Sequence, residues 1–156
     1  MGHGHQEAGP AAQSLNRIAA SATAHCLTGC AIGEVLGFVI GTWRGWGDVA
    51  TMALAIALAY LFGYSFTLVP LVRGGLALGT AMGLAFAADT LSITVMEIVD
   101  NGVMLVVPGA MDATLGDPLF WGALAFSLAV AGLAAFPVNR WLIARGRGHA
   151  VVHAHH

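Results

Sequence analysis

The segment that decides the fold runs from Ile18 to Trp43 and has the sequence IAASATAHCLTGCAIGEVLGFVIGTW. It is long enough to cross a membrane, because a hydrocarbon core about 30 Å thick needs about 20 helical residues. Ionisable groups in such a helix cost about 2.5 to 3.5 kcal/mol each, so they usually face a bundle interior and mark an ion, proton or ligand path. This segment carries four side chains of that kind: His25, Cys26, Cys30 and Glu34.

The composition of the whole chain is as apolar as that of this segment. Of the 156 residues, 58% are hydrophobic and only 9% are charged, and lysine is absent. Ordinary soluble domains carry about 25% charged residues, so lipid is the expected surroundings of most of the chain. The net charge is −2, which leaves no basic surface for phosphate contacts and excludes nucleic acid as an expected partner.

Four segments reach the length of a membrane span, and we expect a helix in each: Ile18–Trp43, Asp48–Val72, Gly74–Val107 and Pro118–Ala144. The third is too long for one straight span, so we expect its crossing to end near Asp100 or Asn101. Residues 102–111 would then lie in the interface or fold back as a re-entrant piece. The predicted fold class is all-α, a polytopic membrane bundle of four transmembrane helices at 18–145 between histidine-containing cytoplasmic tails at 1–17 and 146–156.

Arginines indicate the orientation of this bundle. Short links make sequential helices antiparallel neighbours, and four crossings place both tails on one side of the membrane. That side collects five of the six basic residues, namely Arg17, Arg73, Arg140, Arg145 and Arg147, while Arg44 lies opposite. The bias predicts that both termini are cytoplasmic. Four tryptophans fall near the span ends, as an aromatic belt requires: Trp43, Trp46, Trp121 and Trp141.

The polar residues of the first span share one face of the predicted helix. At 100° per residue, Cys26, Cys30 and Glu34 fall within a sector of about 80°. Four glycines run along nearly the same face at four-residue spacing, which lets another backbone approach closely: Gly29, Gly33, Gly37 and Gly41. The polar groups are therefore expected to point into a tight contact between helices.

The third span shows a similar pattern. Asp89, Met96, Glu97 and Asp100 fall in one sector of about 100°, with Met82 and Met104 along the same face. Counted from the predicted starts of their helices, Glu34 and Asp89 lie at similar depths near the bilayer centre. We expect these two carboxyl groups to face each other, with one of them holding a proton or both sharing a cation.

The donor types in this pattern suit a transition metal. Thiolates favour copper(I) and zinc, and imidazole also favours zinc and copper. The candidate metal ligands are His25, Cys26, Cys30, Glu34, Asp89 and Glu97. Histidines in the tails could capture the same ions: His3, His5, His149, His153, His155 and His156. The cysteine spacing is nevertheless short of a paired C-x2-C zinc signature.

Each of these residues also has a purely structural interpretation. A buried cysteine serves as a small hydrophobe, and methionine fills gaps in a core. His25 could make a structural hydrogen bond near the interface. Glu97, Asp100 and Asn101 could be interfacial, with one of them paired to Arg44.

Two runs of sequence carry a resemblance to a known family. At Ala24–Glu34 (AHCLTGCAIGE) and at Ala88–Ile98 (ADTLSITVMEI), the chain resembles a family of small bacterial membrane proteins catalogued only as a domain of unknown function. The resemblance covers about Ala24 to Arg145. It implies a four-span helical fold in the bacterial cytoplasmic (inner) membrane, and it implies no activity.

The leading functional hypothesis is a protein that binds or conducts a copper- or zinc-class ion between the first and third spans. In one form of this hypothesis, protons move in exchange for the ion. The alternative is a non-catalytic accessory or assembly subunit, and either role fits a homo-oligomer or a membrane partner subunit. A third alternative is thiol redox chemistry at Cys26 and Cys30, which requires a helix broken near Gly29. The chain has no nucleophile elbow, phosphate loop or dinucleotide fingerprint, which favours a non-enzymatic role.

Overall fold

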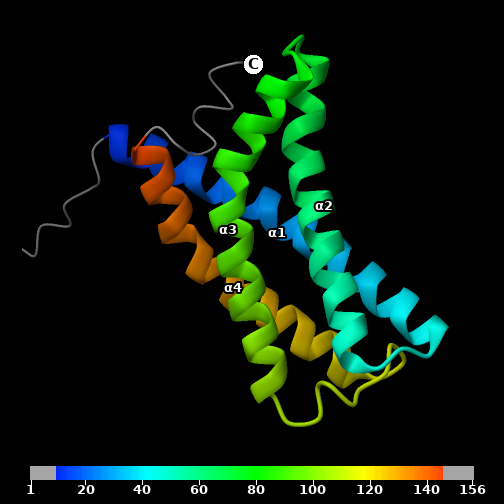
Figure 1. Ribbon diagram of the computed structural model, residues 1–156. Helices are drawn as coiled ribbons and strands as arrows, with labels where there is room; N and C mark the ends of the chain where they lie inside the picture. Colours follow the sequence, from blue (N-terminus) through cyan, green and yellow to red (C-terminus); the bar gives the residue numbers. More distant parts are fainter. Residues whose placement is uncertain (1–9, 146–156) are drawn as a thin grey trace, which may run out of the picture.

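The computed structural model describes residues 10–145, which form four helices (Figure 1). These are α1 (Pro10–Arg44), α2 (Asp48–Arg73), α3 (Leu78–Val106) and α4 (Pro118–Ala144). The described part of the chain contains no β-strand. All four helices are long and apolar enough to cross a membrane, so the expected four-span, all-α fold is confirmed.

Two helix starts differ from those expected from the sequence. α1 begins at Pro10 instead of Ile18, because proline is favoured in the first helical turn and the following Ala-Ala-Gln-Ser-Leu continues a helix readily. α3 begins at Leu78 instead of Gly74, after a turn in which Gly75 has a φ of +96°. A residue's depth counted from the predicted start is therefore too small in α1 and too large in α3.

The third span forms one continuous helix, so residues 102–106 do not fold back as the re-entrant piece that is one of the two expected alternatives. α3 continues through Asp100 and Asn101 to Val106, because no proline occurs in it before Pro108. The other alternative, that residues 102–111 lie in the interface, stays a prediction. The 29 residues of α3 reach about 43 Å at 1.5 Å per residue, which exceeds the thickness of a hydrocarbon core. A helix of that length tilts in the bilayer or extends into the interface.

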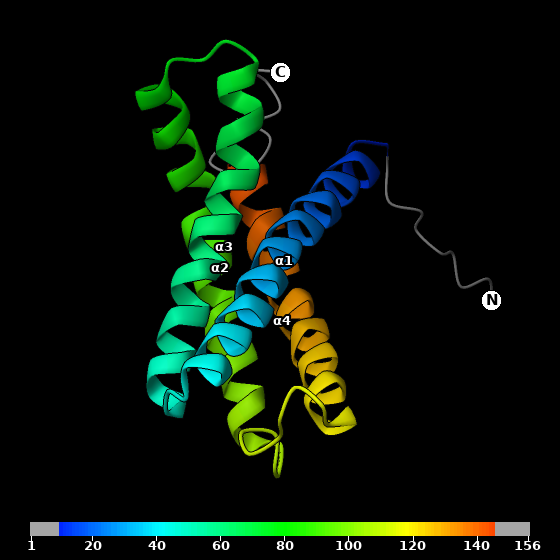
Figure 2. The same cartoon turned by 90° about the vertical axis from the view of Figure 1, so that its right-hand side faces the viewer.

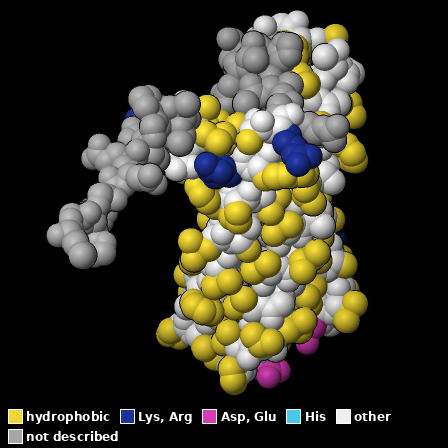
Figure 3. All heavy atoms as spheres, turned by 90° about the vertical axis from the view of Figure 1, so that its left-hand side faces the viewer, with side chains coloured by type: hydrophobic (Ala, Val, Ile, Leu, Met, Phe, Trp, Pro, Cys, Tyr) yellow, Lys and Arg dark blue, Asp and Glu magenta, His cyan; other side chains and the backbone are white. Residues whose placement is uncertain are grey.

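The bundle has two chemically different ends. The start of α1, the end of α4 and the α2–α3 turn lie at one end, which we call the terminal end; the other two connections lie at the loop end (Figures 1 and 2). Figure 3 shows arginine side chains near the terminal end, acidic side chains at the loop end, and hydrophobic side chains between them. The five described arginines are all exposed, and Arg147 lies outside the described residues.

The tightest helix contact joins α1 to α2. A Cβ atom added to Gly29 would lie 2.8 Å from the Cα atom of Gly63, and one added to Gly33 would overlap the backbone of Ala59. α2 meets these glycines with a stripe of small buried residues: Thr51, Ala55, Ala59, Gly63 and Thr67. The expectation that the α1 glycines allow close packing is confirmed, and their partner is α2.

Candidate functional site

The polar residues of α1 and α3 meet along a single contact between the two helices. Every member is at most 5% exposed, so the side chains point into the bundle and away from lipid. We call this set the acidic seam, and it comprises Cys26, Cys30 and Glu34 of α1 with Asp89, Glu97 and Asp100 of α3. The seam has three levels, and each pairs one α1 side chain with one α3 carboxyl group.

The first level pairs Cys26 with Asp89. The Cys26 Sγ atom lies 3.8 Å from the Asp89 Oδ1 atom, a distance at which a thiol donates a weak hydrogen bond to a carboxylate. Ser92 of α3 lies next to the same thiol, and Thr67 of α2 lies next to Asp89. Hydroxyl groups thus surround this pair inside the membrane.

The second level pairs Cys30 with Glu97, whose carboxyl group lies next to the thiol. The side-chain amide of Asn101 donates to Glu97 Oε2 at 3.4 Å and to the Glu97 backbone carbonyl at 2.8 Å. Within residues 10–145, the Oε1 atom of Glu97 receives no hydrogen bond. This carboxyl group is therefore only half satisfied by the residues around it.

The third level pairs Glu34 with Asp100. The two carboxyl groups are neighbours, and the Ser127 hydroxyl of α4 donates a hydrogen bond to Asp100 Oδ1. Neither Glu34 oxygen receives a hydrogen bond from the described residues. Ionised carboxylates are acceptors only, so a hydrogen bond between these two groups requires a shared proton, and ionisation of both requires a cation.

The expected pairing of Glu34 with Asp89 is wrong. Asp89 lies at the level of Cys26, and Glu34 lies one level further toward the loop end than Glu97, beside Asp100. The error follows from the helix starts, because the early start of α1 and the late start of α3 shift the two depth counts in opposite directions.

Four of the six predicted metal ligands form two pairs, Cys26 with Asp89 and Cys30 with Glu97, while Glu34 pairs with Asp100. His25 is half-buried and packs edge-on against Phe66 of α2, with ring centroids 5.5 Å apart. Among residues 10–145, no three His, Cys, Asp or Glu side chains gather closely enough to hold a metal ion. The histidines predicted as metal-capturing groups in the tails lie outside the described residues.

The methionines divide between the core and the surface. Met96 is buried in one cluster with Cys26 and Cys30, while Met82 is 55% exposed on the lipid-facing side. Met104 is buried in another cluster, near the loop end. Of these three methionines, Met96 is the one that shares a buried cluster with the two seam cysteines.

Both cysteines are free thiols in a continuous helix. α1 runs without a break through Gly29, so the interruption that a Cys26–Cys30 disulfide would need is absent. Two sulfur atoms four residues apart on a regular helix do not satisfy disulfide geometry. The structure therefore favours roles for these thiols other than disulfide exchange with each other.

Asp100 is the one seam residue that is not among the predicted metal ligands. An interfacial position does not fit this residue, because it is only 3% exposed and its carboxyl group accepts a hydrogen bond from Ser127. The Arg44 guanidinium instead lies over the Trp43 ring, 5.5 Å from its centroid. One available signal was the four-residue spacing of Ser127, Ala131, Ala135 and Asn139, which marks a small and polar face on α4.

Comparison with known proteins identifies a family for most of the chain. A family model described as "Domain of unknown function (DUF4396)" matches residues 16–148, which include all six residues of the acidic seam. No curated protein and no solved structure matches the chain.

Proposed function

Since the chain belongs to the DUF4396 family, a domain of unknown function, we propose its function from the acidic seam itself. The protein binds a transition-metal ion of the copper or zinc class within the membrane and conducts it along α1 and α3. Protons move in exchange, carried by the same carboxyl groups.

The observation that carries this proposal is the burial of Glu34 beside Asp100, where neither Glu34 oxygen receives a hydrogen bond from residues 10–145. The five described arginines are all exposed, so none of them is buried beside this pair. A buried carboxylate requires a positive partner, and a pair of acids requires one more strongly. Protons or a metal cation supply that charge.

The donor atoms favour a soft or borderline ion. Cys26 and Cys30 offer sulfur at two successive levels, and Glu34 with Asp100 offers oxygen at the third. Sulfur favours copper(I) and zinc over calcium or magnesium. Conduction needs several weak sites in series, and pairs of ligands suit such passage better than one closed four-ligand site.

We infer the orientation of the pathway in the membrane from the charges at the two ends of the bundle. We place the terminal end in the cytoplasm, because arginines gather there and acidic residues lie at the loop end (Figure 3). In a bacterial inner membrane, the Cys26 level then faces the cytoplasm and the Asp100 level faces outward. A homo-oligomer would supply additional ligands, and we propose that state for the working protein.

Metal analysis of the purified protein tests the first part of the proposal. Wild type is expected to retain copper or zinc, and the double variant Cys26→Ser, Cys30→Ser is expected to lose it. Met82→Leu is the matched control, because it removes an exposed sulfur outside the seam. Absence of bound metal in the wild type, or equal binding by the double variant, would refute the proposed metal site.

Flux measurements in proteoliposomes separate conduction from an accessory role. Glu34→Gln and Asp89→Asn are expected to reduce metal-driven proton movement, because each removes an ionisable group from the seam. If flux is unchanged while a native oligomer dissociates, the carboxyl groups serve assembly, and the accessory function replaces this proposal.

A further inference from the structure

A groove between α2 and α3 reaches one residue of the seam from the lipid-facing side. Its volume is about 340 Å³. Ile98 on its wall is 69% exposed, so the groove opens on the surface that lipid covers. The lining residues are Ile56, Tyr60, Thr94, Glu97, Ile98 and Asn101.

The one acidic group in this groove lacks a complete set of partners. Glu97 is only 5% exposed, and its Oε1 atom receives no hydrogen bond from residues 10–145. Asn101 occupies the other oxygen, at 3.4 Å. A buried carboxylate in an apolar wall is stabilised by a positive charge, and the groove itself provides none.

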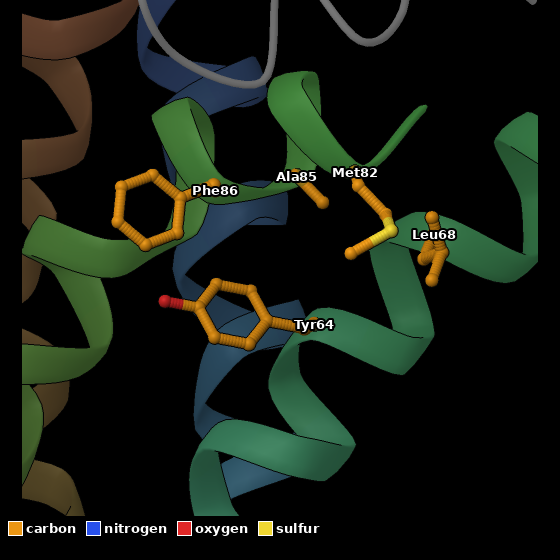
Figure 4. A pocket seen from close by; sticks show the side chains of 5 residues that line it. All are labelled: Tyr64, Leu68, Met82, Ala85 and Phe86. Atoms are coloured by element: carbon orange, nitrogen blue, oxygen red, sulfur yellow. The ribbon is translucent and has the colours of Figure 1, made fainter. Parts of the chain in front are cut away.

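Aromatic rings extend from Glu97 toward the terminal end. The rings of Tyr60 and Tyr64 lie 5.8 Å apart, and Phe86 stacks on Tyr64 at 6.2 Å. Figure 4 shows Tyr64 and Phe86 in the adjoining pocket, with Leu68, Met82 and Ala85. The α2–α3 surface therefore combines one carboxyl group with a row of aromatic rings.

Hydrogen bonds fix the two tyrosine rings. The Tyr60 hydroxyl lies 2.6 Å from the Thr94 hydroxyl, and the Tyr64 hydroxyl lies 2.7 Å from that of Thr90. Because each threonine also bonds a backbone carbonyl of α3, the tyrosine hydroxyl groups are held on that helix. The Tyr60 ring is thus held in place where it lines the groove.

We propose that this groove binds a monovalent organic cation with an apolar body, with the charge beside Glu97 and the body against Tyr60. Ring faces attract quaternary ammonium groups and similar cations. A delocalised organic cation loses little hydration on entering apolar surroundings, whereas a small inorganic ion would lose much more. The volume lies at the lower end of the range for small-molecule pockets, about 300 to 1,000 Å³.

Binding of tetraphenylphosphonium to the purified full-length protein in detergent tests this site, with equilibrium dialysis as the measurement. Wild type is expected to bind the probe, and Glu97→Gln is expected to weaken binding about tenfold, because a charged partner is lost. Tyr60→Leu should weaken binding about fivefold, and Tyr60→Phe should retain it. Asp48→Asn is the carboxyl control, because Asp48 is exposed in the first turn of α2 and absent from the groove.

A second pair of variants leaves the carboxyl group intact. Ile98→Trp fills the mouth of the groove at an exposed position and should weaken binding about tenfold. Leu36→Trp alters an apolar groove on α1, lined by Ala31, Ile32, Val35 and Leu36, and should leave binding unchanged. No binding by wild type, or wild-type affinity in Ile98→Trp, would overturn the inference.

The result is distinguishable from that of the metal proposal. Cys26→Ser should weaken metal binding and still bind the phosphonium probe, because Cys26 pairs with Asp89 and does not line the groove. Metal binding without probe binding would reject the groove alone, and probe binding without metal binding would reject the metal site alone.

Discussion

Glu34 on α1 lies beside Asp100 on α3, and both side chains are buried where α4 adds Ser127. Three helices thus meet around two carboxyl groups and one hydroxyl. Within residues 10–145, the Ser127 hydroxyl is the one hydrogen-bond donor to these two carboxyl groups. The chemistry of this level therefore depends on a proton or a cation that the side chains do not provide.

Replacing the donor at this level should destabilise the bundle. Ser127→Ala removes the hydroxyl that binds Asp100 and leaves a buried oxygen with one partner fewer, at a cost of about 1 to 3 kcal/mol. Thermal unfolding in detergent measures the loss. Ser65→Ala is the control, because the bond that the Ser65 hydroxyl donates goes to the Leu61 carbonyl of its own helix and joins no second helix. Equal stability of both variants would contradict the assigned role of Ser127.

Changing Glu34 to an amide should separate stability from function. The amide of Glu34→Gln can donate to Asp100, so the variant is expected to unfold at or above the wild-type temperature while it loses proton exchange. Glu34→Leu offers no donor and should unfold at a lower temperature. Unfolding curves and proton flux, measured on the same preparations, give both readouts. A lower unfolding temperature for Glu34→Gln than for Glu34→Leu would argue against the carboxyl pair.

The α1–α2 contact should tolerate no added side-chain volume. Gly33→Ala introduces a methyl group that overlaps the backbone of Ala59, so the helices must separate, at a cost of about 1 to 3 kcal/mol. Gly83→Ala is the control, because its added Cβ atom meets nothing within 4 Å. Denaturant or thermal unfolding compares the two variants. The prediction fails if Gly33→Ala is as stable as Gly83→Ala.

The loop before α4 should become less ordered as the pH falls. The backbone N–H of Thr114, and next its hydroxyl, donate to the Asp117 carboxylate and lower its pKa from the ordinary value. Since the folded pKa is the lower one, the contribution of Asp117 is present above its unfolded pKa and disappears as pH falls through the folded pKa. The effect on stability is small, because the group is fully exposed.

An NMR titration of the Asp117 carboxyl carbon measures this shift. Thr114→Ala removes the hydroxyl donor and keeps the backbone N–H, so the pKa of Asp117 should rise part of the way toward its ordinary value. Thr114→Ser keeps both donors and should retain the low pKa. An unchanged titration in Thr114→Ala would show that the hydroxyl contributes nothing.

Local information in the sequence was sufficient for the four spans and for the inward faces of α1 and α3. Length and apolar composition predict a membrane helix without reference to other segments, and the expected bounds of Pro118–Ala144 agree with α4. The helical period places Cys26, Cys30 and Glu34 on one side, and all three are buried. The family expected from the two sequence runs is also confirmed.

Only the tertiary structure decided which groups meet. The pairing of Glu34 with Asp100 depends on where α1 and α3 begin and on how they cross, and neither follows from the period within one helix. Ser127 of α4 contacts Asp100 of α3, and Thr67 of α2 contacts Asp89 of α3. The residue pattern within one helix does not show which residues of another helix it will meet. A helix pattern fixes the angle of a side chain around its own axis; the height and identity of its partner come from packing between helices.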